Sequence, residues 1–402
     1  MKILHTADWH LGKYLHKVDL LPEMLLFLDW LHTFISDEGV KVLLVSGDIF
    51  DTANPSHEAK TAYFGFLAKM IPLGVKVIII GGNHDSVSLL EGPSEVLENL
   101  DIHIIGGGTL AKTKGIIPIL DSERNVNAVV LAVPFLRDGD VMADLNATLT
   151  KDAQIKEGIT RYYQDMFDLA KAEYPGELPL IAMGHLLVVG SEMSDSERDI
   201  HIGNLGALSP RFFGERFDYV ALGHIHKPQV FFDGKVRYAG SPICLSFSEK
   251  NYSKQVVLLE LSGGIIQGIE PIPVPKYRTL VQLRGTLEEV RTALREIDRP
   301  YMLPNLVEIH IEEQHYSAEA MLEFQSLSQT SEQSDYQIAF SKITFKETPF
   351  EEGMPQAFQT IEEVDPRQML LLKLDNSTME EEEKSDILEA YEQILQEILD
   401  EN

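Results

Sequence analysis

Five short polar clusters in this sequence contain residue types that bind metal ions. Together they offer carboxylates, imidazoles and one amide oxygen, and they contain no sulfur. The clusters are Asp8-x-His10, Gly47-Asp48-x-x-Asp51, Gly81-Gly82-Asn83-His84-Asp85, Gly184-His185 and Gly223-His224-x-His226. This donor set suits Mn²⁺, Fe²⁺ or Zn²⁺ and is too rich in nitrogen for Ca²⁺.

A centre with two metal ions needs more ligands than any one cluster provides. It also needs a bridging carboxylate to hold the ions ~3.5–4 Å apart, where they can activate water for in-line attack at phosphorus. Pooled, the five clusters contain enough ligands for such a centre. Glycines precede Asp48, Asn83, His185 and His224, and we expect them to let the backbone turn sharply and to leave room for substrate.

The elements that must position these clusters are short apolar runs, because each cluster directly follows one. In the first third of the chain, such runs alternate with amphipathic segments, which is typical of β-α-β units and a parallel sheet. Strands are predicted at 2–5, 42–46 and 76–80, and the second intervening helix is predicted to begin at Asn54-Pro55. The carboxyl ends of parallel strands meet at one edge of a sheet, so distant clusters can meet there.

The pattern changes after residue 137. Helices are predicted at about 138–149 and 152–173. Strands are predicted at 179–183, 218–222, 229–232, 236–239, 255–261 and 265–269. Hairpin turns at Asp233-Gly234 and Gly263-Gly264 indicate that these strands form a second, largely antiparallel sheet.

Three domains are predicted in the 402 residues, with boundaries at prolines and glycines. Residues 1–275 form the main domain, which ends in the proline-spaced stretch Pro271–Pro275. Residues 276–346 form a small α+β domain. Residues 347–402 form a helical tail, in which Thr378-x-x-Glu381 resembles a capping box. An apolar stripe follows it at Ile387, Leu388, Tyr391, Ile394, Leu395, Ile398 and Leu399.

The composition excludes several classes of protein. No apolar run approaches the ~18 residues of a membrane span, and the N-terminus lacks a signal peptide's apolar core, so we expect a cytoplasmic protein. The single cysteine, Cys244, excludes an internal disulfide and a thiolate zinc site, and we interpret it as a buried small apolar residue.

The net charge of −29 is unfavourable for a protein that would hold nucleic acid alone. Residues 347–402 contain 17 acids and three bases, so nearly half of the net charge lies in the tail. We expect phosphate contacts to come from the metals, a partner and local bases. The candidate bases are Lys13, Lys17, Lys60, Arg137, Arg198 and Lys227.

Each cluster taken alone is a weak signal, since Asp-x-His and Gly-Asp-x-x-Asp are common at turns and helix starts. Five such clusters in order at strand ends are hard to obtain by chance. The other histidines lie outside this pattern, and we interpret each as a surface or locally hydrogen-bonded residue. They are His16, His32, His57, His103, His201, His310 and His315.

The clusters in this order resemble the calcineurin-like metallophosphoesterase superfamily. Longer segments are more similar to bacterial nuclease subunits of this superfamily that act with an ATPase. These segments are Ile3–Lys13, Gly47–Thr52, Gly82–Ser86, Arg198–Gly203, Ala221–His226 and Gly240–Ile243. The resemblance implies an α/β fold: a two-sheet β-sandwich flanked by helices, with a small α+β capping domain that positions DNA and a helical C-terminal tail that binds the ATPase.

The resemblance also implies the roles of individual residues. One Mn²⁺ would be held by Asp8, His10, Asp48 and His226, and the other by Asp48, Asn83, His185 and His224. Asp48 would bridge the two ions, and Mg²⁺ or other divalent ions are alternatives to Mn²⁺. His84 would lie beside the phosphate, to stabilise charge or to protonate the leaving oxygen. Archaeal relatives have a histidine where this chain has Asp51, so we expect Asp51 to orient a ligand imidazole instead.

The function that the resemblance implies is a two-metal DNA nuclease. It would be an exonuclease on duplex ends and an endonuclease on single strands and hairpins, acting as a homodimer within a heterotetramer with the ATPase. Two alternatives stay open. One is a small-molecule phosphatase or cyclic-nucleotide phosphodiesterase with the same centre, and the other is a scaffold on a decayed phosphoesterase fold.

Overall fold

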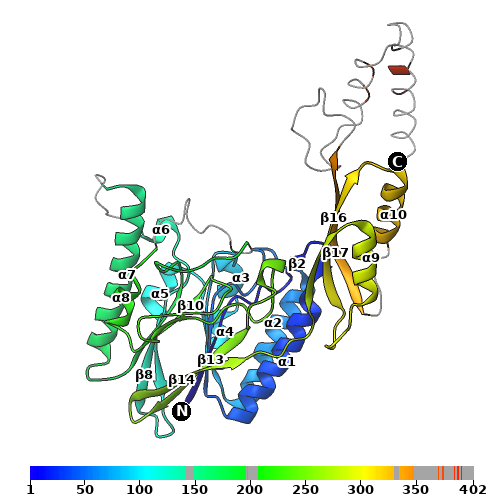
Figure 1. Ribbon diagram of the computed structural model, residues 1–402. Helices are drawn as coiled ribbons and strands as arrows, with labels where there is room; N and C mark the ends of the chain where they lie inside the picture. The colour runs from blue at the N-terminus through cyan, green and yellow to red at the C-terminus, as the bar shows by residue number, and fades with distance from the viewer. Residues whose placement is uncertain are drawn as a thin grey trace. The chain divides into compact units, whose positions relative to one another are not determined.

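The computed structural model describes residues 1–141, 149–195, 197, 207–329 and 335–347, and the isolated positions 370, 374, 384, 387, 388 and 391. The chain divides into two compact units (Figure 1). One contains residues 1–313 and 318–344, and the other contains residues 314–317 and 345–402. Within the described residues, no helix combines the length and the apolar character that a membrane crossing requires.

The first sheet has six strands in the order β14-β13-β1-β4-β5-β6. Its strands are β1 (Lys2–Thr6), β4 (Val42–Ser46), β5 (Lys76–Ile80), β6 (Ile102–Ile105), β13 (Gln255–Ser262) and β14 (Ile265–Pro273). The predicted parallel strands β1, β4 and β5 are neighbours, and β6 extends them. β13 and β14 join the other edge antiparallel, so the prediction that they belong to the second sheet is wrong.

The second sheet also has six strands, in the order β11-β12-β10-β9-β8-β7. They are β7 (Ile116–Leu120), β8 (Val126–Ala132), β9 (Leu180–His185), β10 (Tyr219–Gly223), β11 (Gln229–Phe231) and β12 (Val236–Tyr238). Its central pairings are parallel, and only the outer pairs β7–β8 and β11–β12 are antiparallel. The prediction of a largely antiparallel second sheet is therefore wrong, since hairpin turns occur only at its edges.

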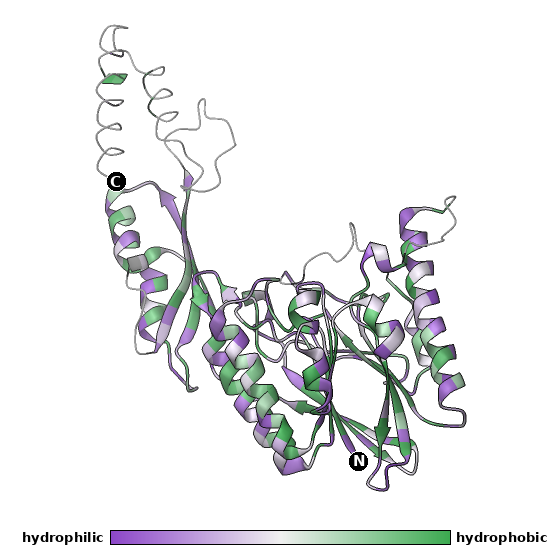
Figure 2. Cartoon of the chain, turned by 180° about the vertical axis from the view of Figure 1, so that it is seen from behind, coloured by the Kyte–Doolittle hydropathy of each residue, from purple (hydrophilic) through white to green (hydrophobic). Residues whose placement is uncertain are grey.

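The two sheets pack face to face, which confirms the predicted β-sandwich. Ile3, Leu44 and Ile78 face a core that they share with Val130 and Val220 of the second sheet. The residues between them on each strand point to the opposite face. There, Leu4, Leu43, Val45, Val77 and Ile79 pack against helices. Burial on both faces explains why these strands are continuous apolar runs (Figure 2).

Two long helices cover the outer face of the first sheet. They are α1 (Leu21–Glu38) and α2 (His57–Met70). The N-cap of α2 is Ser56, whose hydroxyl accepts a hydrogen bond from the Ala59 amide at 3.1 Å, so the predicted start at Asn54-Pro55 is two residues too early. The predicted helix at 152–173 is confirmed as α7 (Lys151–Glu173). The one at 138–149 is described only as α6 (Asp138–Val141).

The remaining short elements connect the strands. They are the hairpin strands β2 (Tyr14–Leu15) and β3 (Val18–Asp19), the helices α3 (Val87–Glu91), α4 (Ser94–Glu98), α5 (Gly108–Lys114) and α8 (Pro210–Gly214), and the 3₁₀ turns η1 (Ile71–Leu73) and η2 (Phe247–Glu249). Along the chain, η2 lies between β12 of the second sheet and β13 of the first sheet.

The predicted small domain contains the three-stranded sheet β15 (Leu280–Gly285), β16 (Asn305–His315) and β17 (Tyr336–Glu347), with helices α9 (Leu287–Arg295) and α10 (Ala318–Gln329). It has a core of its own at Leu287, Val290, Leu294, Val307, Ile309 and Ile311. The Tyr277 hydroxyl donates to the Leu26 carbonyl of α1 at 3.2 Å, and buried Arg278 pairs with Glu23 of α1 at 3.0 Å.

Pro271 and Pro273 lie in β14, the edge strand of the first sheet, where a missing amide is tolerated. They are therefore part of the sheet and not a separate connector. The predicted domain boundaries at 275/276 and 346/347, and the capping role, stay predictions. In the tail, Ile394, Leu395, Ile398 and Leu399 lie outside the described residues.

Candidate metal centre

The structure brings all five polar clusters to one edge of the sandwich. Asp8 and His10 follow β1, Asp48 follows β4, and Asn83 and His84 follow β5 of the first sheet. His185 ends β9, and His224 and His226 follow β10 of the second sheet. Except for half-buried Asn83, these side chains are buried. The expectation that separate strand ends would converge here is met.

Three groups of side chains place potential ligand atoms within 4.8 Å of one another: Asp8, His10 and His226; Asp48, His185 and His224; and His10, Asp48 and His84. The first group is the first predicted ligand set without the bridging Asp48. The second group is the second predicted set without Asn83. Asn83 lies beside the second set, because its Oδ1 is 2.9 Å from His185 Nε2.

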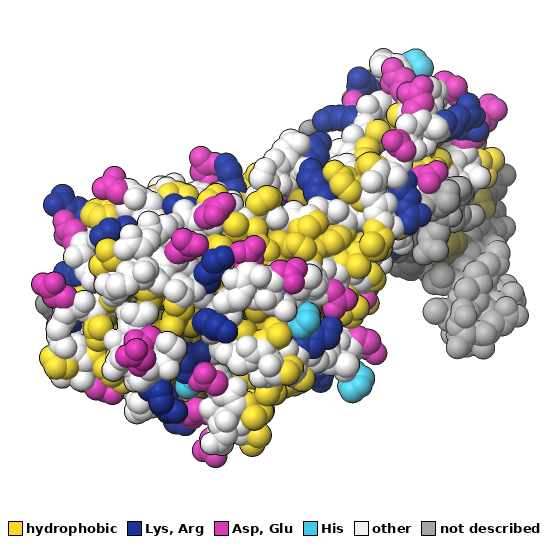
Figure 3. Space-filling view, turned by 90° about the horizontal axis from the view of Figure 1, so that it is seen from below, with side chains coloured by type: hydrophobic (Ala, Val, Ile, Leu, Met, Phe, Trp, Pro, Cys, Tyr) yellow, Lys and Arg dark blue, Asp and Glu magenta, His cyan; other side chains and the backbone are white. Residues whose placement is uncertain are grey.

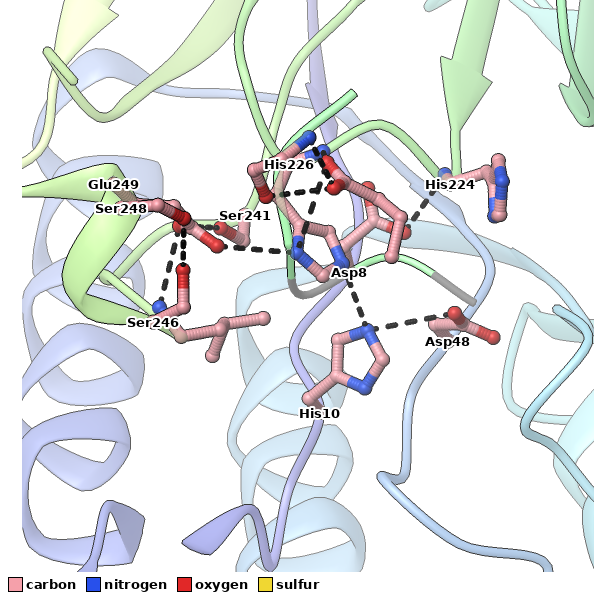
Figure 4. Close-up of polar contacts among 12 residues, drawn as sticks. Asp8, His10, Asp48, His224, His226, Ser241, Ser246, Ser248 and Glu249 are labelled. Atoms are coloured by element: carbon pink, nitrogen blue, oxygen red, sulfur yellow. Dashed lines mark hydrogen bonds and ion pairs between the residues drawn. The ribbon is translucent and has the colours of Figure 1, made fainter. Parts of the chain in front are cut away.

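Asp48 lies between the two predicted ligand sets. Its Oδ2 is 3.4 Å from His10 Nε2 and also 3.4 Å from His185 Nε2. One oxygen therefore faces an imidazole of each set, as a bridging ligand would. Figure 4 shows its contact with His10. Asp48 Oδ1 accepts the backbone amide of His84 at 3.0 Å, which fixes the orientation of the carboxylate.

The ring nitrogens of His10 and His226 face each other in a way that fits a cation. Their Nε2 atoms are 3.2 Å apart. His226 Nδ1 is hydrogen-bonded to a Glu249 oxygen at 3.3 Å, so it carries the proton and leaves a lone pair on Nε2. His10 Nδ1 lies 3.2 Å from an Asp51 oxygen without the geometry of a hydrogen bond. Two nitrogens bound to one ion at ~2.0–2.1 Å stand ~3.0–3.4 Å apart at usual ligand angles.

Buried polar atoms without partners also fit metal ligands. Asp8 Oδ2 and His224 Nε2 are two of the seven buried side-chain atoms in the described residues that make no hydrogen bond. A buried carboxylate oxygen or imidazole nitrogen without a partner costs free energy unless an ion or water satisfies it. The donor set therefore suits two divalent ions.

Several of these residues have a strained backbone. The φ angles of Asp8, His10, Asp48 and His224 are +54°, +45°, +48° and +97°. Non-glycine residues rarely adopt such values, and each costs on the order of 1–3 kcal/mol. Backbone hydrogen bonds between the loops keep these residues in the strained conformation. Examples are the bonds from Asp8 N to Gly47 O at 3.0 Å and from His10 N to Asp48 O at 2.9 Å. No sequence pattern signals this strain.

The glycines of the motifs make room for the site's own atoms. A Cβ on Gly82 would lie 2.1 Å from Asp48 Oδ1, one on Gly47 would lie 2.3 Å from His185 Nδ1, and one on Gly223 would lie 1.8 Å from the Ser46 carbonyl oxygen. Of these three, only Gly47 has a positive φ, at +88°. The predicted sharp turn is therefore found at Gly47, whereas the predicted space for substrate is occupied by protein atoms.

Residues behind the predicted ligands hold them in place. His185 Nδ1 donates to the Ser46 carbonyl at 3.0 Å, which turns Nε2 toward Asp48. Asp85 accepts the amides of Ile49, Phe50 and Gly82 at 2.9–3.1 Å and so joins two of the loops. Sequence reasoning assigns no role to Asp85, although it lies within one of the five clusters.

Burial and neighbouring charges shift the pKa values of the site residues in opposite directions. Burial raises the pKa of Asp8 to about 7. Burial also acts to raise the pKa of Asp48, but His185 and His10 hold it well below its usual range. Burial acts to lower the pKa of His185, yet Asp48 raises it to about 9. Burial lowers the pKa of His224 well below its usual value. A metal ion at the Asp48–His185 pair must therefore displace a proton.

The structure also places the residues outside the pattern. His16 is exposed and stacks on Phe340, with ring centroids 4.7 Å apart, and His103 pairs with Asp101, as expected for surface or locally hydrogen-bonded histidines. Cys244 is half-buried, and burial raises the pKa of its thiol to about 11. His201 and Arg198 lie outside the described residues.

Two of the candidate bases reach the site. Lys13 pairs with Asp51 at 3.1 Å, and Arg137 donates to the Asp85 carbonyl at 3.2 Å. Lys227 directly follows His226 but pairs with Glu192.

Comparisons with known proteins agree with the geometry. The family model "Calcineurin-like phosphoesterase" matches residues 1–228. The chain is 35% identical over 336 residues to the SbcD subunit of the nuclease SbcCD from Escherichia coli K12, covering 82% of each chain. It is 38% identical over 316 residues to the SbcD of Rhodobacter capsulatus, covering 75% of this chain and 77% of that one. For the SbcD of Bacillus subtilis the identity is 32% over 306 residues, covering 74% and 76%. The resemblance predicted from the motifs is confirmed.

Proposed function

We propose, from the premise that this chain belongs to the calcineurin-like phosphoesterase family, that it is a Mn²⁺-dependent DNA nuclease acting with an SbcC-like ATPase. The chain is an enzyme, a metal-dependent phosphodiesterase. In the proposed function it is a double-strand exonuclease and a single-strand and hairpin endonuclease in DNA repair, recombination and replication. The observation that carries the proposal is Asp48 Oδ2, which lies 3.4 Å from an imidazole nitrogen of each ligand set.

Two Mn²⁺ ions per chain are the proposed cofactors, with Mg²⁺ or other divalent ions as alternatives. Asp8, His10, Asp48 and His226 would hold one ion, and Asp48, Asn83, His185 and His224 the other. Bound there, the ions would activate a water and offset the charge of the phosphodiester. The buried partnerless atoms of Asp8 and His224 support these assignments.

His84 is the proposed catalytic residue. Its Nδ1 donates to the Asp51 carbonyl at 2.6 Å, so its Nε2 points away from that carbonyl. From this position the ring would stabilise charge on the phosphate or protonate the leaving oxygen. The Asp51 carboxylate would orient His10, which it contacts at 3.2 Å.

DNA is the proposed substrate despite the acidity of the chain. Acidic and basic side chains are interspersed on the face seen in Figure 3, without a continuous basic stripe on that face. Lys13 and Arg137 are two basic side chains tied to the loops of the site. We propose that they, the metals and the ATPase supply the phosphate contacts, and that residues 276–346 help to place the DNA.

The proposed assembly is a nuclease homodimer within a heterotetramer in the cytoplasm. The relatives are named as one component of the SbcCD nuclease, which supports a complex with a second kind of chain. A groove of about 540 Å³ between α1 and α2 is lined by apolar residues such as Leu21, Leu25 and Phe66 and by polar ones such as Asp29, Glu58 and Lys69. Leu25 is 43% exposed, and a second copy of the chain would cover it.

The test is a digest of linear duplex, hairpin DNA and a chromogenic phosphodiester with Mn²⁺, with and without the co-purified SbcC-like ATPase. We expect cleavage of all three, with DNA cleavage increased by the ATPase. Hydrolysis of the chromogenic ester alone would favour the small-molecule phosphodiesterase. No bound metal and no hydrolysis would favour the scaffold.

A further inference from the structure

A buried carboxylate outside the predicted ligand sets contacts one of their imidazoles. Glu249, in the turn η2, is fully buried, and its Oε1 lies 3.3 Å from His226 Nδ1 (Figure 4). Its other oxygen, Oε2, accepts the Leu245 amide at 3.2 Å and the Ser241 hydroxyl at 3.4 Å. Because an ionised carboxylate only accepts hydrogen bonds, this contact places the proton of His226 on Nδ1 and turns Nε2 toward His10.

A buried lysine holds this carboxylate. Lys254 Nζ donates to Glu249 Oε2, to the Ser241 hydroxyl at 2.7 Å and to the His226 carbonyl at 3.3 Å. One ammonium therefore ties together the carboxylate, a hydroxyl and the backbone of the ligand itself. Lys254 is 9% exposed, and a buried charge pair persists only when its partners are well placed.

The same turn contacts the small domain on its other side. Phe247 lies 6.0 Å from the His16 ring, and that ring stacks on Phe340 of β17 at 4.7 Å. Lys250, directly after the turn, donates to Gln282 of β15 at 2.6 Å. All of these residues belong to one compact unit. η2 therefore contacts a predicted metal ligand through Glu249. It is linked to the small domain through His16, whose ring lies between Phe247 and Phe340, and through Lys250, the residue that directly follows the turn.

We propose that Glu249 is a positioning residue for His226, and that η2 makes metal binding at His226 depend on how the small domain packs. The proposal rests on the proposed metal centre. Glu249 touches neither metal nor substrate. It holds the His226 ring in the tautomer and direction that ligation needs, and a shift of Phe340 or Gln282 moves the turn that carries it.

The test measures Mn²⁺ binding by the full-length protein, by electron paramagnetic resonance of the free ion and by metal analysis after dialysis. Glu249→Gln keeps the size of the side chain but removes its charge and lets an amide face His226. We expect the affinity for one of the two ions to fall about 10- to 100-fold and the other to stay unchanged. Equal affinities in Glu249→Gln and wild type would overturn the positioning role.

The matched control is Glu91→Gln. Glu91 accepts the amides of Gly106 and Gly107 at 3.1 and 2.9 Å, away from His226, so the same chemical change should leave both affinities unaltered. If Glu249→Gln does not fold, Ser241→Ala removes only a hydroxyl from the network. We then expect a smaller loss at the same ion, and an unchanged affinity would count against the proposal.

The link to the small domain is tested by Phe340→Ala, with Ile343→Ala as its control on the same strand. Ile343 packs on the small domain's own core. We expect Phe340→Ala to lower the affinity for the same ion about 2- to 30-fold. Ile343→Ala should leave that affinity unchanged. Equal effects in the two variants would overturn the link. Wild-type protein that binds no Mn²⁺ would instead overturn the proposed function.

Discussion

His84 donates its Nδ1 proton to the backbone carbonyl of Asp51, with the two atoms 2.6 Å apart. The contact crosses from the loop after β5 to the loop after β4. It fixes the plane of the His84 ring beside His10, whose ring centroid is 4.7 Å away. His84 thus stands at the predicted metal centre with one ring nitrogen committed to the protein.

We expect His84→Gln to keep both metals and to lose turnover by about 10²- to 10⁴-fold, because the imidazole is predicted to act on the substrate. Metal analysis and hydrolysis of a chromogenic phosphodiester measure the two effects separately. His84 also lies in a group with His10 and Asp48 that could hold an ion. If the metal is lost together with activity, His84 is a ligand instead.

Asp48→Ala is expected to have the largest effect on metal binding of any single substitution, because one oxygen faces both ligand sets. Metal content should fall at both sites and activity should be lost. Asp121→Ala is a control, since Asp121 is a half-buried turn carboxylate outside the site. Near-normal Mn²⁺ content in Asp48→Ala would contradict the bridging role.

The metal-free protein should lose stability as the pH rises from about 6.5 to about 9. Burial acts to lower the folded-state pKa of His185, but the effect of Asp48 is larger and raises this pKa to about 9. Protonated His185 stabilises the fold fully below its pKa in the unfolded chain, ~6.5. This stabilisation disappears as the pH rises through the folded-state pKa of His185. Thermal unfolding in EDTA checks this.

The loss should be at most about 3 kcal/mol. Mn²⁺ should remove the pH dependence, since metal displaces the His185 proton. His185→Gln should also remove it. The same slope in His185→Gln and wild type would show that other groups titrate.

Gly82→Ala is expected to abolish metal binding, because the new Cβ would lie 2.1 Å from Asp48 Oδ1 and 2.3 Å from the Asp48 amide. Gly65→Ala is the matched control. Gly65 is in helix α2 with no atom within 4 Å of the added Cβ, so this change should stabilise the protein by about 0.5–1 kcal/mol. Normal Mn²⁺ binding by Gly82→Ala would mean that the Asp48 loop can move aside.

Leu395→Asp should weaken co-purification of an SbcC-like ATPase. Leu395 lies on the predicted apolar stripe of the tail, and a helix in this position would insert the stripe into a groove of its partner. Gln393→Asp adds the same charge off the stripe and should bind normally. Unchanged binding by Leu395→Asp would place the interface elsewhere on the nuclease.

Sequence patterns alone locate most of the fold. The apolar runs of β1, β4, β5, β9 and β10 and the periodicity of α1 and α2 are local signals, because each element's own residues determine which face is buried. Strand pairing is not a local signal. The sequence pattern assigns β13 to the wrong sheet because its partner β1 lies at the other end of the chain, where Val257 pairs with His5. No local pattern records such a pairing.

The sequence by itself predicted which residues meet at the candidate site, and for three clusters the reason is topological, because they follow parallel strands of the first sheet. The packing of the second sheet on the first brought His185, His224 and His226 to the same edge. The sequence could not reveal the positive φ of Asp8 and Asp48, because loop-to-loop hydrogen bonds impose that strain. Nor could it reveal Glu249 and Lys254, which belong to no motif. The ion pair between Glu249 and Lys254 is strong only in the folded protein, where both side chains are buried away from water and each charge needs its partner. Tertiary structure therefore decided how the predicted ligands are held.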